Sequence, residues 1–293
     1  MSKHEFAKEL ANKVADKLGM GYDVSVIDVP LGTCMTPKIV IRRENEYASP
    51  TFGIEEYWED RSRGTDLLAT ELLKLYESVK NSGKDIEQQA KSLTCYESAK
   101  DMLRVKLINK RKNTMYLKDV HYKTFLDDFA IIPYLIVVRN GEMVGTALVK
   151  NDLLNLWNKN FEEVFQVACD NTKQSETMKF NEMSTLLPSQ FTDEFPALAD
   201  TPQMYVMTNT EMQFGAVQVV FHSEQIDTIA EQTGGAYVIF SSIHEVIIIT
   251  DTYSSQTLEY LSSMNREVNK TMDEREVLGE RAYYYQLSKG FIE

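Results

Sequence analysis

The sequence has few of the residues and motifs on which several classes of protein depend. Its three cysteines, Cys34, Cys95 and Cys169, lie far apart and form no CxxC pair, which argues against a zinc knuckle or a thioredoxin-type redox site. The simplest interpretation is three reduced thiols in a cytoplasm. No apolar run approaches the roughly 18 residues of a membrane span, and Glu5 and Glu9 interrupt any N-terminal signal sequence. We therefore expect a cytoplasmic location and no membrane partner.

Specific catalytic and nucleotide-binding motifs are also missing. The sequence has no phosphate-binding GxxxxGK loop, no GxGxxG loop, no HExxH pair and no GxSxG elbow. Basic residues number 31 against 44 acidic ones, which gives a net charge of −13. Nucleic acid and anionic membranes repel such a chain, which argues against both as partners. We predict no cofactor, and a protein partner is the class left open.

The chain of 293 residues is long enough for one large domain or two modest ones. Helix-like and hairpin-like patterns alternate irregularly, which predicts an α+β fold of antiparallel hairpins and sheets with helices packed on them, in two unequal halves. We expect an N-terminal half at 1–174 and a C-terminal half at 204–293. The connecting segment 175–203 is polar and contains Pro188, Pro196 and Pro202.

Apolar periodicity places the main elements. Residues three and four apart predict helices at Lys3–Leu18, Ile54–Glu59, Thr65–Val79, Tyr96–Asn109, Asn151–Trp157, Phe161–Cys169, Ser223–Thr233 and Leu258–Val268. Short apolar runs predict strands around Val24–Pro30, Lys38–Arg42, Phe129–Val138, Met143–Val149, Met204–Asn209, Gly215–Val219, Ala236–Phe240, Val246–Thr250 and Arg281–Leu287. Asn140-Gly141 between two of these runs indicates a hairpin turn.

The predicted inner faces of two helices can be named in advance. They are Leu68, Leu72, Leu75 and Val79 in one helix, and Leu258, Leu261, Met264 and Val268 in the other. A further pattern concerns Val137–Val149 and Val206–Val219, which each read as a hairpin followed by a helix. This similarity could reflect a duplicated unit or turn chemistry alone.

One dense basic cluster stands out in this acidic chain: Arg104, Lys106, Lys110, Arg111 and Lys112. We interpret it as the solvated end of the predicted 96–109 helix, where cations complement the helix dipole. The alternative is a patch for phosphate or an acidic partner. No aromatic stacking platform or glycine loop accompanies the cluster, so the first interpretation is favoured.

The segment Ser241–Glu245 is the best candidate site. It joins two apolar runs, so we interpret it as the turn of a hairpin in which Ser241 and Ser242 bond backbone groups and His244 and Glu245 lie at the strand mouth. Strand alternation would place His244 and Glu245 on opposite faces, which excludes a local acid–base pair.

The alternative is a hydrolase in which Ser241 or Ser242 is the nucleophile, His244 its base and Asp128 a partner from another segment. The Ser-x-His spacing is too close for the usual triad. A metal-binding variant would combine His121 with Asp127 and Asp128. Adjacent carboxylates more often mark the entry to a strand, so we predict no metal site.

Several segments together resemble one bacterial protein family. They are Tyr205–Asn209, Phe214–Ala216, Ile229–Glu231 and Ser241–Ile247, with Leu126–Ala130 and Tyr283–Tyr285 in the expected places. On these residues the chain is similar to the family catalogued as domain of unknown function 5688. The resemblance implies a cytosolic bacterial protein and transfers no activity. We therefore favour a non-catalytic intracellular binding or interaction protein, with a hydrolase near Ser242 and His244 as the alternative.

Overall fold

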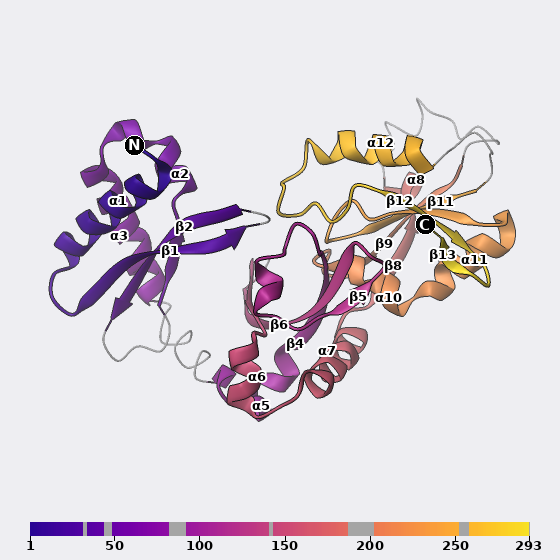
Figure 1. Ribbon diagram of the computed structural model, residues 1–293, viewed down its shortest axis with the longest axis horizontal. Coiled ribbons are helices and arrows are strands. Elements are labelled where there is room, and N and C mark those ends of the chain that lie inside the picture. The colour runs from indigo at the N-terminus through magenta and orange to yellow at the C-terminus, as the bar shows by residue number, and fades with distance from the viewer. Residues whose placement is uncertain are drawn as a thin grey trace. The chain divides into compact units, whose positions relative to one another are not determined.

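The computed structural model describes residues 1–31, 34–43, 49–81, 92–140, 143–186, 202–251 and 258–292. Contacts divide the chain into two compact units (Figure 1). Unit 1 comprises Met1–Asp101 and Ile136–Thr146, and unit 2 comprises Met102–Leu135 and Ala147–Glu293. The predicted α+β class with antiparallel sheets is confirmed. Part of the expected connection at 175–203 forms a strand and a short helix inside unit 2.

Unit 1 contains a three-stranded antiparallel sheet, in the order β1 (Tyr22–Leu31), β2 (Cys34–Arg43) and β3 (Thr51–Gly53). Two amphipathic helices, α1 (Lys3–Leu18) and α3 (Thr65–Asn81), bury their apolar stripes with the sheet in one core. A capping box of Ser2 and Glu5 begins α1 at the predicted residue. The described part of unit 1 also contains the short helices α2 (Glu55–Glu59), η1 (Arg61–Arg63) and α5 (Tyr96–Ala99).

The predicted inner face of α3 is correct at Leu68 and Leu72 and wrong at Leu75, and the side chain of Val79 lies outside the described residues. Leu75 is 46% exposed, whereas Tyr76 is buried and makes edge contacts with Tyr22 and Phe52. The buried stripe therefore follows every fourth residue, Leu68, Leu72 and Tyr76, and the large ring of Tyr76 fills the space beside the sheet.

The helix predicted at Tyr96–Asn109 is wrong beyond its first turn. After α5 and η2 (Lys100–Met102), the chain forms strand β4 (Leu103–Asn109). Leu103, Val105 and Leu107 are fully buried, while the intervening Arg104 and Lys106 are half-buried. This alternation is the period of a strand, and the tertiary pairing of β4 outweighs its helical propensity. The basic cluster therefore lies on a strand and the turn after it.

The smaller sheet of unit 2 is built around the first half of β6 (Phe129–Asn140). This strand pairs with β4 on one side and with β5 (Lys123–Phe125) on the other. It also pairs with β7 (Met143–Leu148), as predicted, although the turn residues 141–142 lie outside the described part. Thr172 of α7 (Phe161–Ser175) accepts the Val105 N–H at 3.0 Å, which ties α7 to the free edge of β4. Two short helices accompany it: η3 (Tyr116–Lys118) and α6 (Asn151–Trp157).

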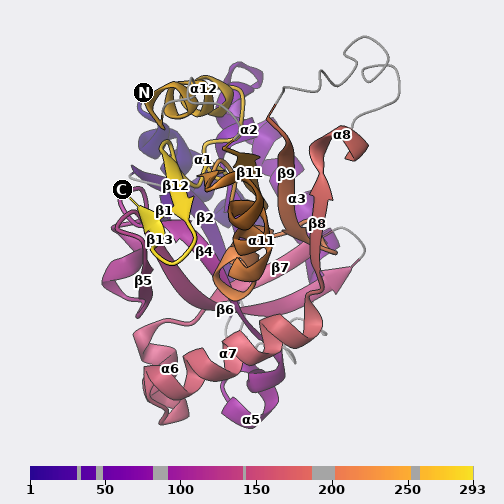
Figure 2. The ribbon, with the colours of Figure 1, turned by 90° about the vertical axis from the view of Figure 1, so that its right-hand side faces the viewer.

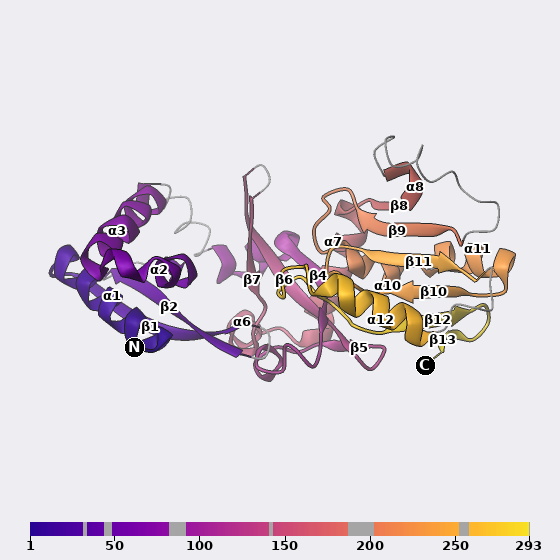
Figure 3. The ribbon, with the colours of Figure 1, turned by 90° about the horizontal axis from the view of Figure 1, so that it is seen from above.

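The larger sheet of unit 2 has six strands, all antiparallel to their neighbours, in the order β13-β12-β10-β11-β9-β8 (Figure 3). Their bounds are Met178–Glu182 for β8, Met204–Asn209 for β9, Ala236–Ile239 for β10, Val246–Thr250 for β11, Ala282–Gln286 for β12 and Gly290–Ile292 for β13. The short helix α8 (Met183–Leu186) follows β8.

Helices α11 (Ser223–Thr233) and α12 (Leu258–Asn269) cover opposite faces of this sheet. Tyr237 and Ile239 pack with Leu261 of α12. On the other face, the Tyr285 hydroxyl donates to Asp227 of α11 at 2.6 Å, and Figure 2 shows α11 in front of the strands. An aromatic cluster joins the two sheets of unit 2 through Phe125, Phe129, Phe240, Tyr283 and Phe291.

The strand predicted at Gly215–Val219 is wrong, because this segment forms η4 (Gly215–Val217) and α10 (Gln218–Phe221). A Cβ on Gly215 would stand 2.5 Å from the His244 carbonyl oxygen, so the chain passes too close to its neighbour for a pleated strand with side chains. Strand β9 pairs with β8 and β11 instead. The second predicted hairpin is absent, and the structure gives no support to a duplication of Val137–Val149.

The predicted inner face of α12 is correct at Leu258 and Leu261, which pack on the sheet, and wrong at its other two positions. Met264 and Val268 are 49% and 55% exposed, whereas Ser262 and Asn265 are buried. Ser262 Oγ accepts the Ala282 N–H, and the Asn265 amide donates to the Gly279 carbonyl, both at 2.9 Å. These hydrogen bonds to the chain entering β12 turn the polar face of α12 toward the protein.

Candidate functional site

The segment Ser241–Glu245 connects β10 to β11, which pair as the predicted hairpin. Ser242 Oγ accepts the backbone N–H of His244 at 3.0 Å, so this hydroxyl stabilises the connection as predicted. Both serines are buried, and His244 and Glu245 are half-buried.

Neighbouring segments on two sides hold this connection by hydrogen bonds to its backbone. On one side, Ile243 N donates to Glu276 O at 2.8 Å, and Leu278 N donates to Ser241 O at 2.9 Å. On the other side, Thr208 Oγ1 donates to His244 O at 2.8 Å, and Ala216 N donates to Ile243 O at 3.3 Å. The polar segment is therefore the meeting point of three parts of unit 2.

The His244 ring has a defined setting. Its Nδ1 accepts the Phe214 N–H at 3.2 Å, and its Nε2 lies 3.7 Å from a Glu276 carboxylate oxygen. Because Nδ1 is an acceptor, neutral His244 carries its proton on Nε2, facing Glu276. The ring stacks on Phe214 with 5.8 Å between centroids, and its side chain is 27% exposed.

Asp128 lies at a different place, where the chain enters β6. Its Oδ2 accepts from Arg281 Nε at 2.8 Å and from the Tyr283 hydroxyl at 2.6 Å, and Arg111 lies 3.4 Å from Oδ1. Burial opposes ionisation of Asp128, but the hydrogen bonds from Tyr283 and Arg281 outweigh it and lower the pKa. Burial and the hydrogen bond to Asp128 raise the pKa of Tyr283.

Ser242 thus contacts His244 only through the backbone N–H of His244 among the described hydrogen bonds. Asp128 is bound by Arg281 and Tyr283 instead. No described hydrogen bond or ion pair joins the His244 ring to Ser241, Ser242 or Asp128. His121 packs on Phe161 with 5.5 Å between ring centroids. Within the described ranges, no three His, Cys, Asp or Glu side chains converge as metal ligands.

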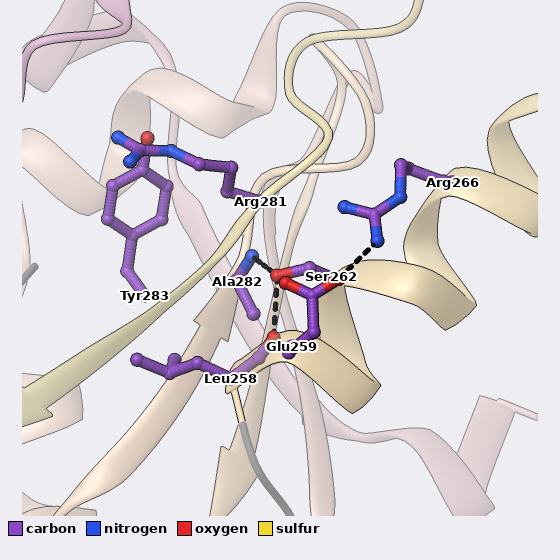
Figure 4. Close-up of a pocket in the computed structure, with 7 residues that line it drawn as sticks. All are labelled: Leu258, Glu259, Ser262, Arg266, Arg281, Ala282 and Tyr283. Atoms are coloured by element: carbon purple, nitrogen blue, oxygen red, sulfur yellow. Dashed lines mark hydrogen bonds and ion pairs between the residues drawn. The ribbon is translucent and has the colours of Figure 1, made fainter.

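A cavity of about 200 Å³ lies between α12 and β12. Figure 4 shows Arg281 and Tyr283 on the β12 side and Arg266 on the α12 side. The remaining lining residues are Leu258, Glu259, Ser262 and Ala282. Arg281 is held by Asp128, so its position is fixed, whereas Arg266 contacts only the exposed carboxylate of Glu259, at 2.7 Å, among the ion pairs described here.

A second cavity, of about 240 Å³, continues along α12 and shares Arg266 with the first. Its other lining residues are Lys112, Asn269, Lys270, Glu274, Val277 and Glu280. Asn269 Oδ1 is buried without a hydrogen-bond partner among the described residues, and its amide nitrogen donates to Gly279 O at 2.9 Å. We call the two cavities together the α12 groove.

Residues 3–287 match the family described as "Family of unknown function (DUF5688)". The chain belongs to this family. The resemblance seen in Ser241–Ile247 and the other segments is confirmed, and the family description carries no activity. No curated protein and no solved structure matches the chain. Among the helices of the described ranges, none combines the length and apolarity needed to cross a bilayer.

The α12 groove was not predicted from the sequence. The groove joins Lys112, Arg266 and Lys270, which are far apart in sequence or separated by a helical turn. A signal was present in the polar residues Ser262, Asn265 and Asn269, which share one helical face at spacings of three and four. The apolar spacing of Met264 and Val268 predicts a different inner face, which the structure does not show.

Proposed function

We propose that unit 2 is a non-catalytic binding module for a small anionic ligand, phosphorylated or carboxylated, which binds in the α12 groove. The observation that carries this proposal is that Arg266 lines both cavities. Lys112 and Lys270 join it, each paired with a half-exposed or exposed carboxylate, Glu280 at 3.3 Å and Glu267 at 2.7 Å, so an anionic ligand would exchange partners with these pairs. Guanidinium and ammonium groups on opposite walls suit carboxylate or phosphate oxygens.

The groove also contains carboxylates, which an anionic ligand would have to displace from the basic side chains. Glu259 pairs with Arg266, but its side chain is 82% exposed. An ion pair this exposed contributes about 0–1 kcal/mol. A ligand oxygen can therefore replace the Glu259 carboxylate at Arg266 at little cost. A ligand hydroxyl or amine would satisfy Asn269 Oδ1 in the second cavity.

The test is calorimetric titration with inorganic pyrophosphate and, separately, with citrate, which distinguish the phosphate and carboxylate classes. Arg266→Gln is expected to weaken binding by about tenfold or more, because a charge-assisted hydrogen bond is lost. Glu259→Gln is expected to tighten binding, since it removes the competing carboxylate.

The matched control is Arg275→Gln. Arg275 is an exposed arginine of the same unit that pairs with Asp273 and lines neither cavity. Its replacement is expected to leave the affinity unchanged. The proposal fails if neither anion gives saturable binding up to about 10 mM, or if Arg275→Gln weakens binding as much as Arg266→Gln.

In this proposal Ser241–Glu245 has a structural role, supported by the backbone hydrogen bonds of Ser242 and His244. The proposal also includes a bacterial cytoplasmic location. The free thiols of Cys95 and Cys169 suit a reducing compartment. Fractionation of the native host, followed by detection of the intact protein, tests the location.

A further inference from the structure

Lys106 occupies an unusual place on β4. Its neighbours Val105 and Leu107 are fully buried on the opposite face of the strand. The Lys106 ammonium lies 4.5 Å from the centroid of the Phe214 ring and 5.1 Å from that of Tyr134. The two rings pack edge to face, 5.3 Å apart, so the amine faces an aromatic wall built by two separate segments.

Other lysines of the chain are paired with carboxylates, such as Lys112 with Glu280 and Lys123 with Glu162. Among the described residues, no carboxylate lies within ion-pair distance of Lys106. Burial without such a partner lowers the pKa of Lys106 to about 8. Roughly a tenth of this amine is therefore unprotonated and nucleophilic at about pH 7.

The His244 ring contacts the same aromatic wall. Phe214 contacts both Lys106 and the His244 ring, whose Nε2 faces Glu276. The Phe214 N–H fixes the His244 tautomer, as described above. The titratable or charged groups on the elements around Lys106 include Arg104, Tyr134, Glu176, His244 and Glu276. Helix α7, which packs on β4, adds Glu162, Glu163, Cys169, Asp170 and Lys173.

We propose that Lys106 is a carbonyl-reactive site that forms an imine with a small aldehyde or ketone. The unprotonated Nζ attacks the carbonyl carbon, and the carbonyl oxygen becomes the hydroxyl of a carbinolamine. Loss of that oxygen with the two amine hydrogens as water gives the carbon–nitrogen double bond, with no change in oxidation state. The Phe214 and Tyr134 rings exclude water from the imine and stabilise its protonated form by cation–π contact. This site is separate from the α12 groove, so each proposal can fail alone.

The experiment treats the full chain with propanal and cyanoborohydride, which traps an imine as a stable secondary amine. Peptide mass spectrometry then gives the labelling rate of each lysine. At about pH 7.5, Lys106 is expected to be labelled at least tenfold faster than Lys179, an exposed strand lysine of the same unit. The rate at Lys106 should level off above about pH 8.

Lys106→Arg keeps the cation and should abolish the fast label while leaving that of Lys179 unchanged. If this variant does not fold, the site-resolved rates of the natural chain still decide the question. Labelling of Lys106 no faster than that of Lys179 at about pH 7.5 overturns the proposal.

Discussion

At the scale of single residues, Lys106 lowers the stability of the fold that holds it. Its pKa is lower in the folded chain than the ordinary lysine value of 10.5, so the unfolded chain binds more protons between about pH 8 and 10.5. The charged form is disfavoured on folding, and the penalty is fully present below about pH 8. A residue retained at such a cost is a reasonable place to look for chemistry.

Lys106→Met is therefore expected to raise the free energy of unfolding at pH 7 by about 2 kcal/mol, because the lowered pKa costs about 3 kcal/mol and the lost cation–π contact is worth about 1 kcal/mol. The advantage should shrink as the pH rises from about 8 toward 10.5. Urea unfolding at several pH values measures it. A variant less stable than the natural chain at pH 7 would contradict this account of the buried amine.

Asp128 makes the opposite contribution. Its pKa is lower in the folded chain, so its stabilisation is present above its unfolded value of about 3.9 and is lost as the pH falls through the folded value. Asp128→Asn should cost about 2 kcal/mol at pH 7, because Arg281 and Arg111 lose their buried anion. The variant should also lose less stability than the natural chain on acidification.

The neighbouring Asp127 provides a matched control, since it is exposed and carries the same charge. Asp127→Asn should change stability by less than about 0.5 kcal/mol. Thermal unfolding of both variants at neutral and acid pH makes the comparison. Equal effects of the two substitutions would show that the network around Asp128 Oδ2 adds nothing specific.

At the scale of elements, the close approach of the backbone at Gly215 explains why the strand predicted at Gly215–Val219 does not form. It also explains why position 215 has no room for a side chain. A Cβ there would also stand 2.5 Å from Thr208 Oγ1 and 2.8 Å from Asn209 N. These atoms belong to a strand and a connection fixed by hydrogen bonds, so they cannot yield easily. The helical turn 215–217 and the β10–β11 connection therefore depend on each other.

Gly215→Ala is expected to destabilise unit 2 by about 3 kcal/mol, from overpacking against backbone. Gly234 is the matched control, because it ends α11 at a φ of +85° with open space around it. Gly234→Ala should cost only about 1 kcal/mol of local strain. Denaturant midpoints compare the two, and equal losses would mean that crowding at Gly215 is relieved by movement.

Elements were predictable from the sequence where one periodicity dominated. Helices α1 and α11 and the β10–β11 pair follow their patterns closely. Predictions failed where contacts with distant segments decide the secondary structure or the orientation of a helix. The β4 strand needs β6 and α7, and the polar inner face of α12 needs the backbone around Gly279. Of the candidate site, only the Ser242 hydrogen bond was foreseen, because it is local.

At the scale of the whole molecule, the two units are interleaved along the chain. The backbone passes between them after Asp101, after Leu135 and after Thr146. No local pattern marks these points, since the second lies inside the continuous strand β6. In a sequence, polar and proline-rich segments are the usual signs of a domain boundary. The boundaries between these two units are instead set by long-range contacts, which no local pattern marks.

This interleaving bears on the order in which the protein is made. Synthesis delivers the first 101 residues of unit 1, then the beginning of unit 2, and only afterwards the hairpin residues 136–146 that complete unit 1. Unit 1 therefore stays incomplete while the ribosome adds Met102–Leu135, 34 residues that belong to unit 2. A gene cut at any one position leaves at least one unit without part of its chain, so separate production of either unit requires a rejoined or permuted gene.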